Sequence, residues 1–172
     1  NLSARTTSLW TLGYAHELQK DYREAEKVFN ETILSGEASG NILFTVLAKA
    51  NLCVLLELEN QLHSASESYQ EILQIVGERP LPVLCDAHLG LARIYYQWND
   101  IDSAVKYAGS GMKLARLFEN SIDRYIVCEL FLSNLKLAAG ETDEAASMIA
   151  GTARSVRQYN FIHRIPELAA QQ

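Results

Sequence analysis

The stretch that decides the fold is Gln19–Phe29, QKDYREAEKVF, because its pattern of small and large residues returns three more times along the chain. Its central alanine, Ala25, is matched by Ala65, Ala104 and Ala145, at intervals of 40, 39 and 41 residues. Side chains three residues before and four residues after each alanine share one helical face. These flanking residues are Tyr22 and Phe29, Leu62 and Tyr69, Ile101 and Ala108, and Thr142 and Ile149. A period near 40 residues predicts a helical repeat protein.

A second pattern lies upstream of each alanine, where a leucine stands beside a smaller residue. The four pairs are Leu12-Gly13, Leu52-Cys53, Leu91-Ala92 and Leu132-Ser133. We expect the small residues to let two paired helices approach closely, and we expect the leucines to fill the adjoining core.

A short turn separates the two patterns in every copy. The turn residues are Lys20-Asp21, Asn60-Gln61, Asn99-Asp100 and Gly140-Glu141, residue types that favour a left-handed helix end or cap the next helix. The predicted unit is therefore helix, tight turn, helix, followed by a longer connection such as residues 34–41 or 77–82.

These units predict an all-α fold of antiparallel helix pairs stacked into a solenoid, in one domain over residues 1–172. The expected repeats cover about residues 5–36, 42–77, 82–118 and 122–157, and residues 158–172 would begin a further repeat. The chain begins without methionine and ends inside an expected helix, so we expect it to be a piece of a longer protein.

Residues 9–29, LWTLGYAHELQKDYREAEKVF, carry a family resemblance. Their Trp, Leu-Gly, Ala, Tyr, Ala and Phe order resembles a tetratricopeptide repeat. The longer period and the tail at residues 153–172 are similar to the helical repeat region of MalT-like, LuxR-type bacterial transcriptional regulators. That resemblance implies a right-handed superhelix that follows a nucleotide-binding switch domain and precedes a DNA-binding domain. Other helical repeats with a 40-residue period are an alternative.

Composition excludes several classes of protein. The chain has 48% hydrophobic and 21% charged residues, which is typical of a soluble globular domain. Its net charge of −6 and its scattered lysines and arginines argue against direct binding of nucleic acid. No apolar run is long enough to span a membrane. The three cysteines form no Cys-x-x-Cys pair, which favours a reducing, cytoplasmic location.

The sequence contains no arrangement typical of catalysis. GSGMK, residues 109–113, has the wrong spacing for a phosphate-binding loop, and the four histidines are isolated from one another and from the cysteines. Cys53 occupies a small packing position, so we interpret it as core filler and not as a nucleophile. We therefore expect no enzymatic activity, no metal and no cofactor.

Binding is the remaining function, and the first helices of such repeats line the inner wall of the solenoid. The candidate residues for a ligand or peptide are Trp10, Tyr14, Glu17, Asn51, Arg93, Tyr96 and Asn134. Some repeats of the family that the chain resembles clamp a peptide carboxylate with lysine and asparagine. Only Arg93 and Asn134 match that role, which disfavours such a clamp. An aromatic and polar wall suits a small neutral effector or a peptide, although Trp10 and Tyr96 could equally pack against neighbouring helices.

The leading hypothesis is a non-catalytic effector- or protein-binding domain of a bacterial transcriptional regulator. The alternative is a general protein–protein adaptor unrelated to transcription. The apolar stretch FIHRIPELAA, residues 161–170, is expected to begin a helix whose partner helix is missing from the sequence. We expect either self-association through this end or a loose end.

Overall fold

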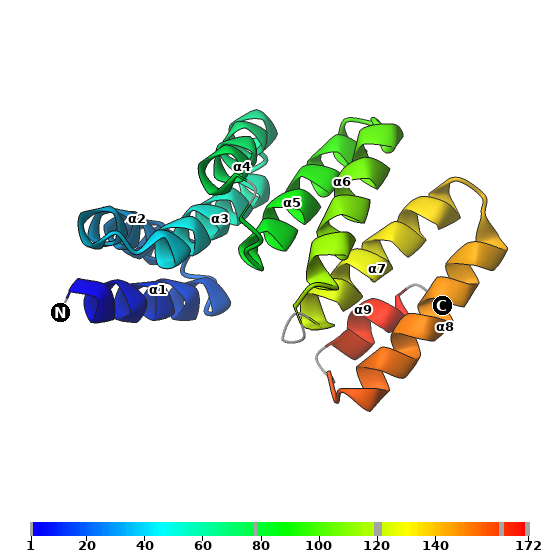
Figure 1. Ribbon diagram of the computed structural model, residues 1–172. Helices are drawn as coiled ribbons and strands as arrows, with labels where there is room; N and C mark the ends of the chain where they lie inside the picture. The colour runs from blue at the N-terminus through cyan, green and yellow to red at the C-terminus, as the bar shows by residue number, and fades with distance from the viewer. Residues whose placement is uncertain (1, 78, 119–121, 162–163, 171–172) are drawn as a thin grey trace. The chain divides into compact units, whose positions relative to one another are not determined.

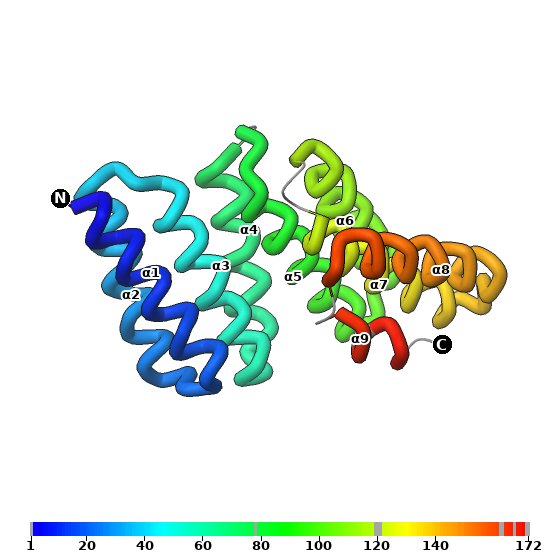
Figure 2. Tube along the Cα trace, turned by 90° about the horizontal axis from the view of Figure 1, so that it is seen from below, coloured from blue at the N-terminus to red at the C-terminus, as the bar shows by residue number. Residues whose placement is uncertain are grey.

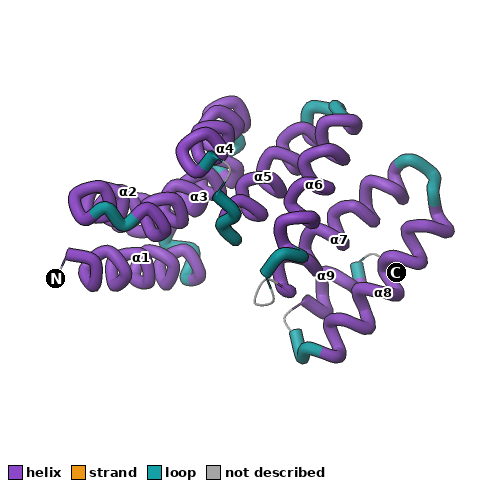
Figure 3. The backbone as a smooth tube through the Cα atoms, viewed as in Figure 1, coloured by secondary structure: helices purple, strands orange, loops and turns teal. Residues whose placement is uncertain are grey.

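The computed structural model describes residues 2–77, 79–118, 122–161 and 164–170, and every regular element within these ranges is a helix (Figure 3). The predicted all-α fold is therefore confirmed. The chain forms two compact units, residues 1–79 and residues 80–172. Each unit is described separately below.

Unit 1 contains two helix pairs, α1 (Leu2–Leu18) with α2 (Tyr22–Ser39) and α3 (Ile42–Leu58) with α4 (Leu62–Val76). Each helix packs on the one before it and runs back along it, and α1 also contacts α3 (Figures 1 and 2). The second helix of one pair thus packs on the first helix of the next pair, and the two first helices are neighbours.

Unit 2 repeats this arrangement with α5 (Val83–Gln97), α6 (Ile101–Ala115), α7 (Ile122–Ala138) and α8 (Thr142–Gln158). Contacts join α5 to α6, α6 to α7 and α7 to α8, and α5 also contacts α7. A short helix, α9 (Ile165–Ala169), packs on α8. The same packing order in both units is what a repeated helix pair predicts.

The turns inside the four pairs share one backbone conformation. The first turn residues, Lys20, Asn60, Asn99 and Gly140, have φ values of 61°, 59°, 60° and 81°. In each turn the next residue donates its N–H to the carbonyl five residues earlier, at 2.8 to 2.9 Å, as Asp21 does to His16. This left-handed helix ending satisfies carbonyls at the helix end. The predicted tight turns are confirmed.

The small residues at the helix crossings are buried as predicted. Ala25, Ala65, Ala104 and Ala145 are all 0% exposed. A Cβ added to Gly13 would stand 2.7 Å from two carbon atoms of the Phe29 ring, closer than carbon atoms approach without a shift. The size of these residues therefore sets how closely α1 and α2 approach.

The predicted role of Leu12 is wrong. Its side chain is 48% exposed, whereas the matching Leu91 is 0% exposed and Leu132 is 9% exposed. Within unit 1, α1 packs on α2 and α3 through the face that carries Thr6 and Gly13. Leu12 lies on a different side of α1 from these residues and is exposed to solvent.

The longer connection predicted at residues 34–41 is also wrong, because α2 continues to Ser39 and leaves only Gly40 and Asn41 between α2 and α3. Burial of Ser35 and Gly36 holds this last part of α2 in the helix, and the hydroxyls of Thr6 and Ser35 lie 2.8 Å apart. Gly40 then turns the chain with φ 66°. The predicted connection at 77–82 does lie between α4 and α5, with residue 78 outside the described ranges.

The end of the chain covers the last helix pair. Leu168 of α9 is 7% exposed, and Phe161 packs beside it against an apolar cluster of α7 and α8. The cluster residues from these two helices are Ile126, Leu130, Ile149, Ala153 and Val156. Arg164 donates to both carboxylate oxygens of Asp123 on α7, at 2.8 and 2.7 Å. Phe161 and Leu168 therefore cover part of this end, whereas residues 162–163 of the predicted apolar stretch lie outside the described ranges. Self-association through this stretch stays a prediction.

We expect Gly13→Ala to destabilise the chain by about 1 to 3 kcal/mol, because the added methyl group meets the buried Phe29 ring. Gly109 of α6 is the control, since an added Cβ there meets nothing within 4 Å. Gly109→Ala should stabilise the helix by up to about 1 kcal/mol. Urea unfolding of both variants measures the two effects, and equal shifts would contradict the packing described at Gly13.

We expect Arg164→Met to loosen α9, because the paired hydrogen bonds to Asp123 are lost while the apolar stem is kept. Hydrogen exchange should become faster at the amide of Ala170, whose N–H donates to the carbonyl of Pro166 at the end of α9. Arg157→Met, at an exposed position of α8, is the control for loss of one positive charge. If the exchange rate at the Ala170 amide does not change, the ion pair does not hold the helix.

Candidate functional site

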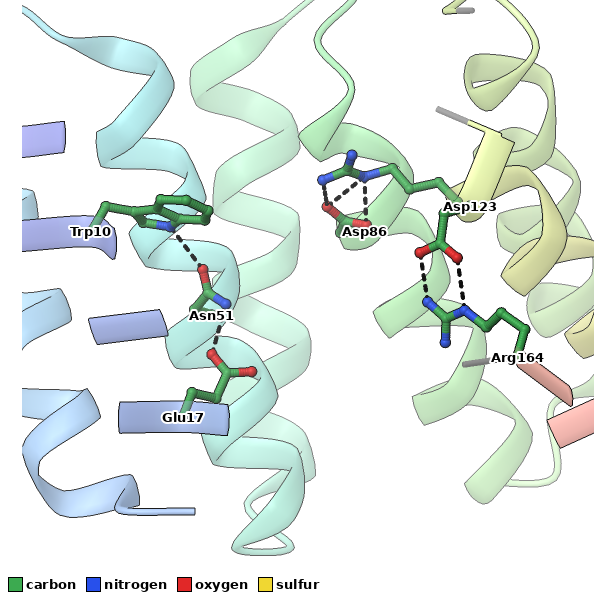
Figure 4. Close-up of polar contacts among 7 residues, drawn as sticks. Trp10, Glu17, Asn51, Asp86, Asp123 and Arg164 are labelled. Atoms are coloured by element: carbon green, nitrogen blue, oxygen red, sulfur yellow. Dashed lines mark hydrogen bonds and ion pairs between the residues drawn. The ribbon is translucent and has the colours of Figure 1, made fainter. Parts of the chain in front are cut away.

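Four of the seven predicted site residues meet on one face of unit 1. Trp10, Tyr14 and Glu17 lie on α1 at spacings of four and three, which places them along one side of the helix. Asn51 lies on the neighbouring α3 and joins Trp10 to Glu17 (Figure 4). The two first helices of unit 1 thus share a small polar and aromatic cluster, which we call the α1–α3 cluster.

The polar part of the α1–α3 cluster is a chain of two hydrogen bonds. The indole Nε1 of Trp10 donates to Oδ1 of Asn51 at 3.1 Å. Nδ2 of Asn51 donates to Oε2 of Glu17 at 2.8 Å. Because the amide both accepts and donates, it fixes the side chains of Trp10 and Glu17 in one arrangement.

The aromatic part of the cluster has a buried side and an exposed side. The rings of Trp10 and Tyr14 stack with centroids 5.5 Å apart and planes 6° apart. Trp10 also packs against the core of α2 and α3 and against the tilted ring of Phe44, at 5.7 Å. Tyr14 is 40% exposed. Trp10 therefore packs against neighbouring helices, which was one of the two interpretations of this residue. The exposed ring of Tyr14 is accessible to a partner.

Burial sets the charge behaviour of Glu17. Partial burial raises the pKa of its carboxyl group, and the hydrogen bond from Asn51 opposes that rise. A carboxylate that is partly removed from water gains more from a hydrogen-bond donor or a positive group than an exposed carboxylate does. The α1–α3 cluster thus places an aromatic surface beside the Glu17 carboxylate, which favours binding of a hydrogen-bond donor.

The other three predicted residues belong to unit 2 and stay predictions. Tyr96 of α5 is 42% exposed and meets the ring of Phe131 edge-on at 6.1 Å, so it packs on its neighbour and still reaches solvent. Arg93 lies on the same helix and is half-buried, and Asn134 of α7 is exposed. The structure does not bring these three residues together with the α1–α3 cluster in one described unit.

An ion pair that was not predicted from the sequence joins α5 to α7. Nε and Nη2 of Arg124 donate to the carboxylate of Asp86 at 2.9 and 2.8 Å (Figure 4). The two residues lie 38 positions apart, close to the repeat period, and that spacing between opposite charges was the available signal. This pair fixes the two first helices of unit 2 to each other.

The cysteines behave as core residues. Burial raises the pKa of the Cys53 thiol to about 12, that of Cys85 to about 11 and that of Cys128 to about 12. All three thiols are therefore protonated near neutral pH, which makes them poor nucleophiles. The interpretation of Cys53 as core filler agrees with its exposure of 1%.

Within the parts of the chain that the structure describes, no three side chains of His, Cys, Asp or Glu are placed to hold a metal ion. No described helix is both long enough and apolar enough to cross a membrane.

Comparison with known proteins places the chain among helical repeats. A family model for the MalT-like TPR region matches residues 1–172, where TPR stands for tetratricopeptide repeat. None of the curated proteins matches the chain in sequence.

Two solved structures are similar to the chain in fold. The crystal structure of BtubC (BKLC) from P. vanneervenii has a TM-score of 0.71 at 15% identity, covering 93% of this chain and 66% of that one. A crystal structure of a putative kinesin light chain from Podospora anserina, with nearly identical TPR-like repeats, has a TM-score of 0.61 at 15% identity. That match covers 91% of this chain and 76% of the other. The chain therefore has the fold of a TPR-like solenoid and spans slightly less than two thirds of BtubC.

We expect Glu17→Gln to gain stability relative to the wild type as the pH rises. Burial raises the folded-state pKa of Glu17, so protonation of this carboxyl stabilises the fold below the unfolded-state pKa, and this stability is lost as the pH rises through the folded-state pKa. Glutamine keeps the acceptor for Asn51 and does not ionise. Urea unfolding at about pH 4 and about pH 7 measures the difference. Glu31→Gln, at an exposed position, is the control; the same pH trend in both variants would contradict the role of burial.

Proposed function

The chain belongs to the family of MalT-like TPR regions, and on this basis we propose that it is the non-catalytic binding domain of a LuxR-type bacterial transcriptional regulator. TPR domains generally bind proteins or peptides, which supports binding as the function of this one. A cytoplasmic location is part of the same proposal, since a transcriptional regulator acts there.

The observation that carries the proposal is the α1–α3 cluster. Trp10, Asn51 and Glu17 are held by two hydrogen bonds before any ligand arrives, so little side-chain freedom is lost on binding. Tyr14 adds an exposed ring stacked on Trp10. A purely structural cluster does not need an exposed aromatic ring beside a hydrogen-bond acceptor. A surface that carries both and is ordered in advance is suited to binding a ligand.

The cluster indicates the chemistry of its ligand. A flat or apolar group would lie against Tyr14, and a hydrogen-bond donor of the same molecule would reach Glu17. A small neutral effector and a peptide both offer such a combination. Arg93, Tyr96 and Asn134 belong to this proposal as candidate binding residues on the first helices of unit 2, separate from the α1–α3 cluster.

The mechanism would follow from unequal affinity for two states of the regulator. A ligand that binds one arrangement of the repeats more tightly shifts the population toward it, by no more than the difference in binding free energy. The ion pair between Asp86 and Arg124 joins two first helices and is a contact that two such arrangements could differ in.

The second candidate is a protein–protein adaptor unrelated to transcription. TPR domains generally bind proteins or peptides, which supports the adaptor hypothesis as much as the regulator hypothesis. The domains encoded on either side of this segment distinguish the two. A nucleotide-binding domain before it and a helix-turn-helix domain after it support the regulator, and other neighbours support the adaptor.

We expect the fluorescence of Trp10 to report binding at the α1–α3 cluster. The chain has two tryptophans, so Trp98→Phe leaves Trp10 as the sole tryptophan, whose emission is selected by exciting at wavelengths that tyrosine does not absorb. Titration with a panel of neutral metabolites and peptides should change its emission for at least one ligand class, and calorimetry should give the affinity.

The matched variants for this titration are Tyr14→Ala and Tyr159→Ala. Both tyrosines are exposed, at 40% and 47%, but only Tyr14 belongs to the cluster. Tyr14→Ala should weaken binding about tenfold or more, while Tyr159→Ala should not. No response across the panel, or equal losses in the two variants, would contradict ligand binding at this cluster.

A further inference from the structure

A groove lies on unit 1 between α2 and α4, with α3 as its floor, and has a volume of about 430 Å³. That volume is in the range of binding pockets. Its lining residues include Arg23, Glu26, Ile33, Leu52, Leu56 and Glu59. None of them belongs to the α1–α3 cluster, so this groove is a separate surface.

The floor of the groove is apolar. Leu52 and Leu56 follow each other at a spacing of four on α3 and lie on one face of that helix, and both are partly exposed. Ile33 of α2 contributes a third partly exposed apolar side chain. An incoming apolar side chain placed over these three residues would lose much of its contact with water, which favours binding.

The groove is long enough for a chain segment. Its lining on α2 runs from Tyr22 to Ile33, which is about 17 Å along the helix at about 1.5 Å per residue. About five residues of extended peptide cover that length. The shape therefore fits a short peptide segment better than a compact ion.

The end of the groove near the carboxyl terminus of α3 is electronegative. Glu59 is the residue that caps α3, and Glu26 of α2 lines the groove with it. The α3 dipole adds no net negative charge here, because α2 and α4 begin at this same end, at Tyr22 and Leu62. The negative charge at this end comes from the two carboxylates. Arg23 is the basic lining residue from α2 and offsets only part of this charge.

The other end of the groove is closer to neutral. Nζ of Lys49 lies 2.9 Å from a carboxylate oxygen of Glu71, so these two lining charges satisfy each other. Unit 1 as a whole carries six lysines and arginines against eleven aspartates and glutamates in residues 1–79. A positively charged partner is therefore favoured at long range as well as at the α3 end.

We propose that the groove between α2 and α4 binds a peptide segment in which a large apolar side chain is followed closely by a lysine or arginine. The apolar side chain lies over Leu52, Leu56 and Ile33. The basic side chain pairs with Glu59 and Glu26. This surface goes beyond the proposed function, because it would give the domain a second binding site with a different partner.

The test uses the whole chain and a short fluorescent peptide of leucine and lysine, with the matched leucine–glutamate peptide as the control probe. Fluorescence anisotropy measures binding. We expect the leucine–lysine peptide to bind and the leucine–glutamate peptide to bind at least about tenfold more weakly. Equal binding of the two peptides would overturn the proposal.

Three variants locate the bound peptide. Asn30→Trp fills the groove without changing its charge, and Glu59→Lys reverses the charge at its end, and each should reduce affinity about tenfold. Glu31→Lys makes the same change of charge on α2 outside the groove lining and should have a small effect. Equal losses from Glu59→Lys and Glu31→Lys would show general attraction to an acidic protein and overturn the proposal.

Two further readouts separate this groove from other sites. Tyr14→Ala should leave binding of the leucine–lysine peptide unchanged, so loss of binding in that variant would place the peptide on the α1–α3 cluster and overturn the proposal. Sedimentation of the chain alone should show no change of mass on Asn30→Trp. A dimer that this variant dissociates would make a second copy the occupant and also overturn it.

Discussion

The close approach of paired helices is the constraint on which the rest of the structure depends. Gly13 leaves room for the Phe29 ring, and the alanines at the matching crossings are fully buried. A larger residue would push the helices apart or force a buried ring to move. Because α1 is held at this distance from α2, Trp10 and Glu17 can reach α3 and form the hydrogen bonds of the α1–α3 cluster.

Much of the fold could be predicted because its signals are local. A few neighbouring residues determine a tight turn or the small residue at a helix crossing. The turn at Asn60 and the buried position of Ala65 were therefore predicted correctly. The end of α2 could not be predicted in the same way. Ser35 and Gly36 read as loop residues, and only the contact with Thr6 and α3 explains why they stay helical.

The candidate site was partly predictable for the same reason. Helical spacing places Trp10, Tyr14 and Glu17 on one side of α1, but spacing does not say which side chain of α3 meets them or how its amide points. The groove between α2 and α4 needs three helices at once and has no local signal. Each lining helix has a mixture of charged and apolar residues, and an ordinary amphipathic helix shows the same mixture. The pattern of one helix therefore does not reveal the groove.

The two surfaces of unit 1 differ in what they offer a partner. The α1–α3 cluster presents a stacked ring and a partly buried carboxylate that are already fixed by Asn51. The groove presents an apolar floor with charges at its rim. The two surfaces share no side chain, so a substitution in one of them can be made without changing the other.

The proposed recognition depends on an α1–α3 cluster that is ordered before any ligand binds, and the exchange of the Trp10 indole proton with solvent tests this order directly. Nitrogen-15 NMR of the Trp98→Phe chain isolates that proton. We expect slow exchange when Asn51 is present to accept the hydrogen bond, and clearly faster exchange in Asn51→Ala. Equal rates in the two proteins would show that the cluster is not ordered in advance and would contradict the account.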